Sequence, residues 1–479
     1  QNDRATFRAP IPTAADSVAQ PVTVTTAAMR SAARFELRPL GSTQLGLALT
    51  SERDLRDYGN TTTMGVVARQ SRRELAGVDL GFERARQVNL RLSYAPPIAA
   101  WLRPRYSFTS TFALQRDPNG RNPERTNGDS AGAFRLPSAF TNTQTSDLSG
   151  TVELARVLAG LLGDSAGLRR ALDRIQSVDL GTRTDRRSQF DRPGFDPSLG
   201  YQLGLGGRDR FRSQASRLAN SASESRLDRI GTAVRFPLNL RVTTSYQTRT
   251  TLLWSLRGAA QQEQRTTDTD WPNLSGQWVL SPRRGLLRKV ITSVTATATL
   301  RVRESESVQP PLQLPSGEVI SGGEIRSTSQ TRSLPLSLGI SWAPRVMTNI
   351  ARSVDRSRTE RSGSLTLNER RQTSADVTFS FRVPPDIIPL RSDVRTTLRY
   401  ASTVNTGCVR NPRSPDCTPI SDSRRKEYTL LMDTDMPPSV TAGLSVSYVL
   451  TEDRHTNRKF SQFVLTANVR VIYTAGEIR

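Results

Sequence analysis

Four stretches within the last eighty or so residues alternate apolar and polar side chains with few exceptions. In the last of them Phe463, Leu465, Ala467, Val469 and Val471 are apolar, and most residues between them are polar. The other three stretches cover residues 392–401, 428–432 and 442–450. A repeat of two residues is typical of a strand, because successive Cβ atoms point to opposite faces of a sheet. The sequence therefore predicts that the chain ends in strands with one apolar and one polar side.

The connections between predicted strands alternate in length. From residue 281 onward we expect short connections at 281–289, near 344, at 384–391 and at 434–440. We expect longer ones at 304–330, 404–424 and 452–459, with a turn near 369. Short turns on the periplasmic side and longer loops outside are typical of a transmembrane antiparallel β-barrel. The fold class that we predict is therefore all-β, a barrel or a large part of one.

The composition suits a single-layer sheet better than several dense cores. Only 35% of the residues are hydrophobic and 6% are aromatic. The mean hydropathy of -0.47 does not exclude a membrane protein, because a barrel strand is apolar only at alternate positions. The chain has no run of about 20 apolar residues, so we expect no transmembrane helix.

The net charge of +23 raises the question of nucleic-acid binding, because such a charge attracts phosphate. Only three of the 67 basic residues are lysine: Lys289, Lys426 and Lys459. The arginines are spread along the whole chain, and no helix-turn-helix, zinc-finger or RNA-binding motif accompanies them. We therefore expect no nucleic-acid partner. A soluble basic β protein that binds nucleic acid or polysaccharide is the alternative of another class.

The chain divides into an irregular lead-in segment, residues 1–32, and a barrel region, residues 33–479. It begins with Gln1, without an initiator Met or a signal peptide, and we expect a processed protein or a fragment of a longer one. Alternation begins near Leu45 and resumes at Met64, Val66 and Ala68, where we expect another strand. Leucine spacing predicts a short helical insertion at 152–175, at a periplasmic connection. The alternative is a helical pair in a separate small domain.

The sequence offers no constellation for catalysis, so we expect no enzyme, no metal site and no cofactor. The single histidine, His455, lies in a charged loop. Two cysteines cannot provide four metal ligands. In an oxidising compartment Cys408 and Cys417 would form a disulfide, and two free thiols are the alternative. Asp268 and Asp270 are expected in a loop.

The barrel interpretation assigns roles to two further groups of residues. Arg241, Arg301, Arg395 and Arg399 alternate with apolar residues, and we expect them to face the lumen, because charge on the lipid face is costly. They would solvate the interior wall or favour acidic cargo. Aromatic residues beside the short turns are expected at the membrane interface. These are Trp101, Trp278, Trp342 and Tyr473.

Several segments, taken in order, resemble one family. They are residues 175–182 with 190–195, the stretch from Asp270 to Trp278 followed by residues 293–295, residues 334–342 and residues 444–454. Together they resemble the C-terminal barrel region of the SprA/Sov family, the outer-membrane translocons of type IX secretion and gliding motility. The resemblance covers about residues 75–473. The chain departs from the family in continuing past Tyr473 to Arg479 and in using arginine in place of lysine and asparagine.

This resemblance implies a location in the bacterial outer membrane and the passage of secreted or surface proteins through a very large barrel. The chain would then supply one part of the wall. The implied partners are outer-membrane lipids, secreted cargo, an accessory outer-membrane barrel and a periplasmic plug protein. A self-contained porin or lipopolysaccharide-assembly barrel is the alternative within the same class. It requires the strands near residues 40 and 470 to pair and close the wall.

Overall fold

The computed structural model describes most of the chain. The described residues are 2–7, 22–59, 62–75, 78–118, 122–125, 134–157, 174–258, 260–282, 287–313, 319–321, 323–342, 345–384, 386, 392–412, 414, 416–436 and 440–471. All structural statements below concern these residues.

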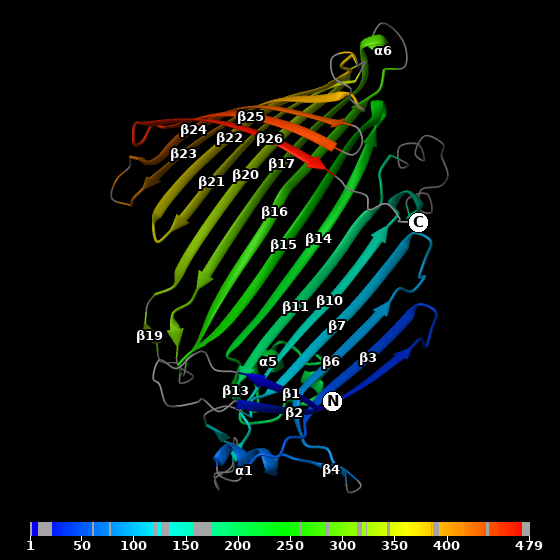
Figure 1. Ribbon diagram of the computed structural model, residues 1–479, viewed down its shortest axis with the longest axis vertical. Coiled ribbons are helices and arrows are strands. Elements are labelled where there is room, and N and C mark those ends of the chain that lie inside the picture. The colour runs from blue at the N-terminus through cyan, green and yellow to red at the C-terminus, as the bar shows by residue number, and fades with distance from the viewer. Residues whose placement is uncertain are drawn as a thin grey trace.

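One antiparallel sheet of 20 strands dominates the structure, and 17 of them form a continuous up-and-down meander (Figure 1). Each strand of the meander from β3 to β25 pairs with the meander strands before and after it. In order they are β2 (Val22–Leu37), β3 (Thr43–Asp54), β6 (Phe82–Tyr94), β7 (Leu102–Arg116), β10 (Ser138–Val152), β11 (Val178–Asp191), β14 (Ser221–Phe236), β15 (Leu240–Arg257), β16 (Ala260–Leu280), β17 (Ile291–Gln309), β20 (Ile325–Trp342), β21 (Val346–Arg361), β22 (Ser364–Phe381), β23 (Val394–Arg410), β24 (Thr418–Met436), β25 (Val440–Asp453) and β26 (Arg458–Val471).

The remaining elements are short. Three short strands join the main sheet: β1 (Asn2–Phe7), β18 (Leu312–Gln313) and β19 (Val319–Ser321). Three two-stranded hairpins stand apart from it: β4 (Glu74–Leu75) with β5 (Val78–Asp79), β8 (Glu124–Arg125) with β9 (Phe134–Arg135), and β12 (Ser213–Gln214) with β13 (Arg217–Leu218). The helices are α1 (Thr63–Gln70), α4 (Leu199–Gln202), α5 (Arg208–Arg212), α6 (Leu287–Val290) and the 3₁₀ turn η1 (Pro237–Asn239).

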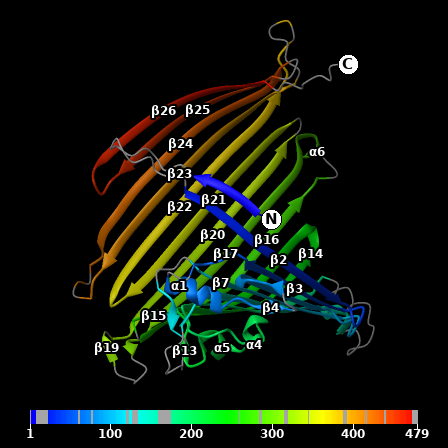
Figure 2. The same cartoon turned by 60° about the horizontal axis from the view of Figure 1, so that its bottom comes forward.

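The two ends of the strands differ in what connects them. At one end, the turn end, the connections include residues 38–42, 95–101, 237–239 and 281–290. At the other, the loop end, lie the longer connections 55–81, 117–137, 192–220 and 310–324. Figure 2, in which the loop end comes forward, shows α1, α4, α5 and β13 at this end. The predicted positions of the connections after residue 281 are largely confirmed, but the predicted order of lengths is wrong in part. The connection predicted short at 384–391 spans residues 382–393, whereas those predicted at 404–424 and 452–459 span only 411–417 and 454–457. The turn expected near residue 369 lies instead at 362–363.

The sheet does not close on itself within the described residues. β26 pairs only with β25, and β1 pairs only with β2 at the opposite edge. The chain thus has the fold of a large, open section of an antiparallel barrel wall.

Residues 192–220, with α4 and α5, form a cap that packs on the sheet at the loop end. Tyr201 of α4 is fully buried against Phe112, Phe140 and Phe190 from three neighbouring strands. Ring centroids in this cluster lie 5.0 to 6.2 Å apart. The Tyr201 hydroxyl also lies 2.7 Å from the Ser188 hydroxyl, so the buried phenol keeps a hydrogen-bond partner. The cap is therefore fixed to the wall by an aromatic core.

The structure corrects the predicted boundaries of the sheet. Residues 1–32 were expected to be an irregular lead-in, but β1 and most of β2 lie there. Small residues weaken the alternation of β2, and its strand conformation depends on pairing with β3. The predicted loops 304–330 and 404–424 are largely strand as well, because polar cross-strand pairs continue the ladder. One of these pairs is the 2.5 Å contact between Arg326 and Glu306.

Two local predictions have different outcomes. The strand expected at 64–68 is wrong, because α1 covers these residues. Met64, Val67 and Ala68 have the spacing of one helical face and are buried, and the Thr62 side chain accepts the Gly65 N–H as an N-cap. The helical insertion expected at 152–175 is observed for residues 154–157, while β10 extends through Val152 and residues 158–173 lie outside the described part of the chain.

The aromatic core predicts a selective loss of stability. Phe140→Ala should destabilise the cap by about 3–5 kcal/mol, because Phe140 is 1% exposed and contacts four aromatic rings. Limited proteolysis should then cleave within residues 192–220. Phe236→Ala is the matched control, because Phe236 is 46% exposed. Equal protease resistance of Phe140→Ala and wild type would show that this core does not hold the cap.

Candidate functional site: a wall with one apolar and one polar face

Strand register places the apolar residues of successive strands on one face of the sheet, near the turn end. Directly paired residues share a face, so this surface can be followed from strand to strand across the whole meander. We call it the apolar band. One member from each strand from β6 to β26 is Leu92, Phe108, Leu148, Leu180, Ile230, Val242, Leu274, Ala296, Leu338, Ile350, Val377, Leu398, Leu430, Val446 and Leu465.

Many large side chains of the band are exposed. Leu148, Ile230 and Leu398 have exposed fractions between 43 and 49%, so little of the described chain packs over them. Apolar patches above a few hundred Å² are rare on soluble monomers and mark contacts with protein or membrane. The band extends across fifteen neighbouring strands, so its extent indicates contact with a continuous apolar medium.

Aromatic rings gather at the loop-side rim of the band. Tyr400, Tyr428 and Tyr448 form a row on adjacent strands, with centroids 5.2 and 6.5 Å apart. Tyr246 and Trp271 form a second group 6.1 Å apart, at the bulge between β15 and β16. Trp271 was not predicted as an interfacial residue, because only the bulge brings it to this rim. Aromatic residues at the rims of an apolar surface are typical of membrane interfaces.

The aromatic residues predicted at the opposite rim lie at the turn end wherever they are described. Trp101 is 41% exposed in the turn between β6 and β7. Trp278 lies near the end of β16 and Trp342 ends β20, where its indole N–H donates to the Thr348 hydroxyl at 2.9 Å. Tyr473 lies outside the described residues. Their interfacial role stays a prediction.

The opposite face of the sheet is polar. Its cross-strand contacts are mostly between hydroxyl, amide and carboxylate groups, as in Thr151 with Asp179 at 2.9 Å and Asn349 with Asp376 at 2.8 Å. These groups need water or one another as partners, so this face is suited to an aqueous space. The two faces of the sheet are therefore suited to environments of opposite polarity.

All four arginines predicted to face the lumen lie on this polar face, as the register shows. Arg301 forms a 2.6 Å ion pair with Asp270. Arg241 donates to the side-chain oxygen of Gln176 at 3.0 Å. Arg395 stands opposite Asp433 on β24, and Arg399 stands opposite Asp376 on β22. Whether this face lines a lumen stays a prediction.

The prediction that the carboxylates of Asp268 and Asp270 lie in a loop is wrong. Asp268 and Asp270 belong to β16 and pair with arginines of β17. Arg303 lies 3.2 Å from Asp268. The pairing was missed because it depends on the register of two long strands, which a bulge shifts between Asp270 and Asn273. The acidic pair thus neutralises arginines of the polar face.

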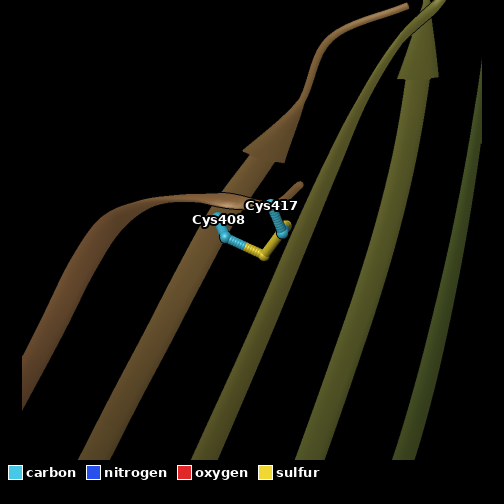
Figure 3. Close-up of a disulfide and its surroundings, with 2 residues drawn as sticks. All are labelled: Cys408 and Cys417. Atoms are coloured by element: carbon cyan, nitrogen blue, oxygen red, sulfur yellow. A yellow bond between two sulfur atoms is a disulfide. The ribbon is translucent and has the colours of Figure 1, made fainter. Parts of the chain in front are cut away.

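The two cysteines and the single histidine lie at the loop end. Cys408 lies near the end of β23 and forms a disulfide with Cys417, with Cα atoms 5.5 Å apart (Figure 3). His455 lies in the turn between β25 and β26, where its backbone N–H donates to Asp453 at 3.0 Å. No group of three potential metal-ligating side chains is found in the described part of the chain. None of its helices is long and apolar enough to cross a membrane.

The comparisons with known proteins add little to this geometry. No protein-family model and no curated protein matches the chain. Among solved structures, it is similar to the ferric enterobactin receptor PfeA of Pseudomonas aeruginosa, with 9% identity, a TM-score of 0.35 and coverage of 88% of this chain and 77% of that one. It is also similar to the ferric yersiniabactin uptake receptor FyuA of Yersinia pestis, with 9% identity, a TM-score of 0.26 and coverage of 92% and 70%. With TM-scores below 0.5, the fold class rests on the strand pairing of the chain itself.

A half-buried phenol at the loop end, that of Tyr58, predicts a pH dependence. Burial, together with the nearby Asp54 carboxylate, raises the pKa of Tyr58 to about 12. A phenol with a raised pKa stabilises the folded segment 55–81 fully below pH 10, and this contribution is lost as the pH rises towards 12. The difference in phenolate absorbance between wild type and Tyr58→Phe should therefore rise near pH 12. A rise near pH 10 would contradict a phenol that is half-buried and hydrogen-bonded to Asp54.

Proposed function

We propose that the chain forms a section of the wall of an outer-membrane β-barrel channel that transports molecules across the membrane. The observation that carries this proposal is the apolar band, which crosses fifteen neighbouring strands and has aromatic residues at its rims. A closed barrel pairs all backbone groups between strands, so it can cross a bilayer without helices. In this arrangement the polar face lines an aqueous passage.

The proposal has an orientation. The turn end would lie on the periplasmic side and the loop end, with the cap and the disulfide, outside the cell. The disulfide supports a location at the outer membrane, because such bonds persist in oxidising compartments, which include both the periplasm and the cell surface. The alternative of a soluble basic β protein would leave the whole apolar band in water.

The finer proposal is that the passage carries folded secreted or surface proteins, as the resemblance to the SprA/Sov family implies. Two features support it. A meander of 17 strands that remains open would form only part of a wider barrel, and its polar face offers hydroxyls and paired charges instead of a tight ligand cage. Secreted cargo, an accessory outer-membrane barrel and a periplasmic plug protein are the partners that this proposal includes.

A self-contained porin or lipopolysaccharide-assembly barrel is the second candidate. It requires β26 to pair with a strand near residue 40. In the described residues β26 pairs with β25 alone, and β3 pairs with β2 and β6. This pairing favours a section of a larger wall.

Substitutions on the two faces of one strand test the membrane contact. Val446→Arg should lower the free energy of unfolding by about 2–4 kcal/mol, because an arginine near the middle of the lipid face is costly. Ser445→Arg is the matched control. Ser445 is the residue before Val446 on β25 and points to the polar face, where an arginine can reach water. Folding into phospholipid vesicles with a urea titration measures both. Equal losses for the two variants, or recovery of the wild type without detergent in the aqueous phase, would rule out the membrane wall.

Site-specific crosslinking tests the cargo. A photo-reactive residue at Thr299, on the polar face, should crosslink to secreted proteins in cells that are actively secreting. The same residue at Leu300, on the apolar band, should crosslink to lipid or to other membrane proteins. Crosslinks to small solutes alone at position 299, with secretion intact, would favour the porin alternative over protein transport.

A further inference from the structure

A cavity of about 430 Å³ lies at the loop end, between the wall, the segment that follows α1 and the cap. Its apolar floor is formed by Phe82, Leu114 and Leu136. Phe82 and Leu136 belong to the cluster that also holds α1, and each is at most 2% exposed. The cavity therefore has a packed base and is not a gap between mobile loops.

The cavity is lined by an unusual number of guanidinium groups. They come from segments far apart in the sequence: the end of β3, the residues after α1, β6, β7 and β9. The arginines are Arg53, Arg72, Arg73, Arg86, Arg116 and Arg135. The carboxylates in the lining are Glu83 and Asp196.

The two carboxylates do not neutralise these arginines. Glu83 pairs with Arg86 at 2.7 Å and with Arg116 at 3.1 Å. Asp196 pairs with Arg116 at 3.1 Å and with Arg135 at 2.5 Å. Three guanidinium groups thus share two carboxylates.

Two of the other three arginines of the lining add uncompensated positive charge. Arg72 pairs with Asp79, which lies outside the lining. Arg53 donates only to the backbone carbonyls of Leu80 and Gly81, and Arg73 forms no ion pair among the described residues. The cavity consequently holds a clear excess of positive charge.

One donor beside this cavity is buried without a partner. The Nε–H of Arg135 is inaccessible to solvent and forms no hydrogen bond among the described residues. Because a water-sized probe does not reach this N–H, an anion in the cavity would be bound by the other guanidinium N–H groups of the lining, whose geometry fits an anion with several oxygens.

We infer that this cavity is a binding site for a phosphate-bearing ligand. Arginine forms paired hydrogen bonds to phosphate, and several guanidinium groups around one cavity fit a group with two or more negative charges. The site does not depend on the proposed transport function, since it lies beyond the apolar band and on the face opposite the polar wall.

The position of the cavity makes two sources of phosphate possible. Arg86 and Arg116 share a face with the apolar band, as the register of β6 and β7 shows. The phosphorylated headgroup of an outer-membrane lipid would reach the cavity from this side. A soluble phosphate compound would reach it from the exterior solution.

Pyrophosphate binding tests the site. The full chain, purified in a neutral detergent, should bind sodium pyrophosphate in isothermal titration calorimetry at constant ionic strength. Arg135→Gln and Arg73→Gln should each weaken binding by about tenfold or more, the loss expected when one charged hydrogen-bonding partner is removed. Arg410→Gln, an exposed arginine at the end of β23, is the control and should leave binding unchanged.

A competition experiment distinguishes the sources. Displacement of pyrophosphate by lipopolysaccharide, but not by its dephosphorylated form, identifies a lipid headgroup as the ligand. Pyrophosphate binding without such competition identifies a soluble phosphate compound.

The proposal is overturned if pyrophosphate binds no better than chloride, or if Arg410→Gln weakens binding as much as Arg73→Gln does. Because Arg135→Gln removes an ion pair and could unfold the loop end, Arg73→Gln decides in that case. Neither result affects the test of the apolar band with Val446→Arg and Ser445→Arg.

Discussion

The backbone hydrogen-bond ladder between neighbouring strands is the interaction on which the other features of the structure depend. In hydrocarbon an unpaired backbone N–H or C=O costs several kcal/mol, so a wall of strands can exist there only if each strand is paired on both sides. From β3 to β25 this condition is met without interruption. The ladder also continues where the side chains are polar on both faces, which keeps strands such as β16 and β17 regular far beyond the apolar band.

Because the ladder fixes register, it also fixes which side chains share a face. A shift of one residue would exchange the two faces of a strand and place arginines such as Arg399 on the apolar band. Long two-stranded overlaps make such a shift costly. The bulge at β16 is an informative exception, because it brings Trp271 to the aromatic rim while the paired residues on either side, Asp270 with Arg303 and Asn273 with Arg301, stay on the polar face.

How much could be predicted from the sequence depended on where along a strand the residues lie. Near the turn end one face is apolar, so alternation is visible and strands such as β20 and β25 were predicted correctly. Near the loop end of strands such as β17 and β24 both faces are polar, and these segments were predicted as loops. Met64, Val66 and Ala68 alternate over too few residues to separate a strand from a helix. The cavity combines arginines up to 82 positions apart, Arg53 and Arg135, which only the folded chain brings together.

The lengths of the strands have a mechanical consequence. β16 contains 21 residues, about 70 Å when extended and about 50 Å in height at a typical tilt, whereas the hydrocarbon layer is about 30 Å thick. In the proposed membrane location the remaining height would form a stiff collar built from paired strands, whose rim includes a turn as short as residues 362–363. Such a collar cannot fold over the opening as a flexible loop would. If the proposed channel is correct, material that crosses it meets a deep, rigid vestibule whose width is set by the sheet itself.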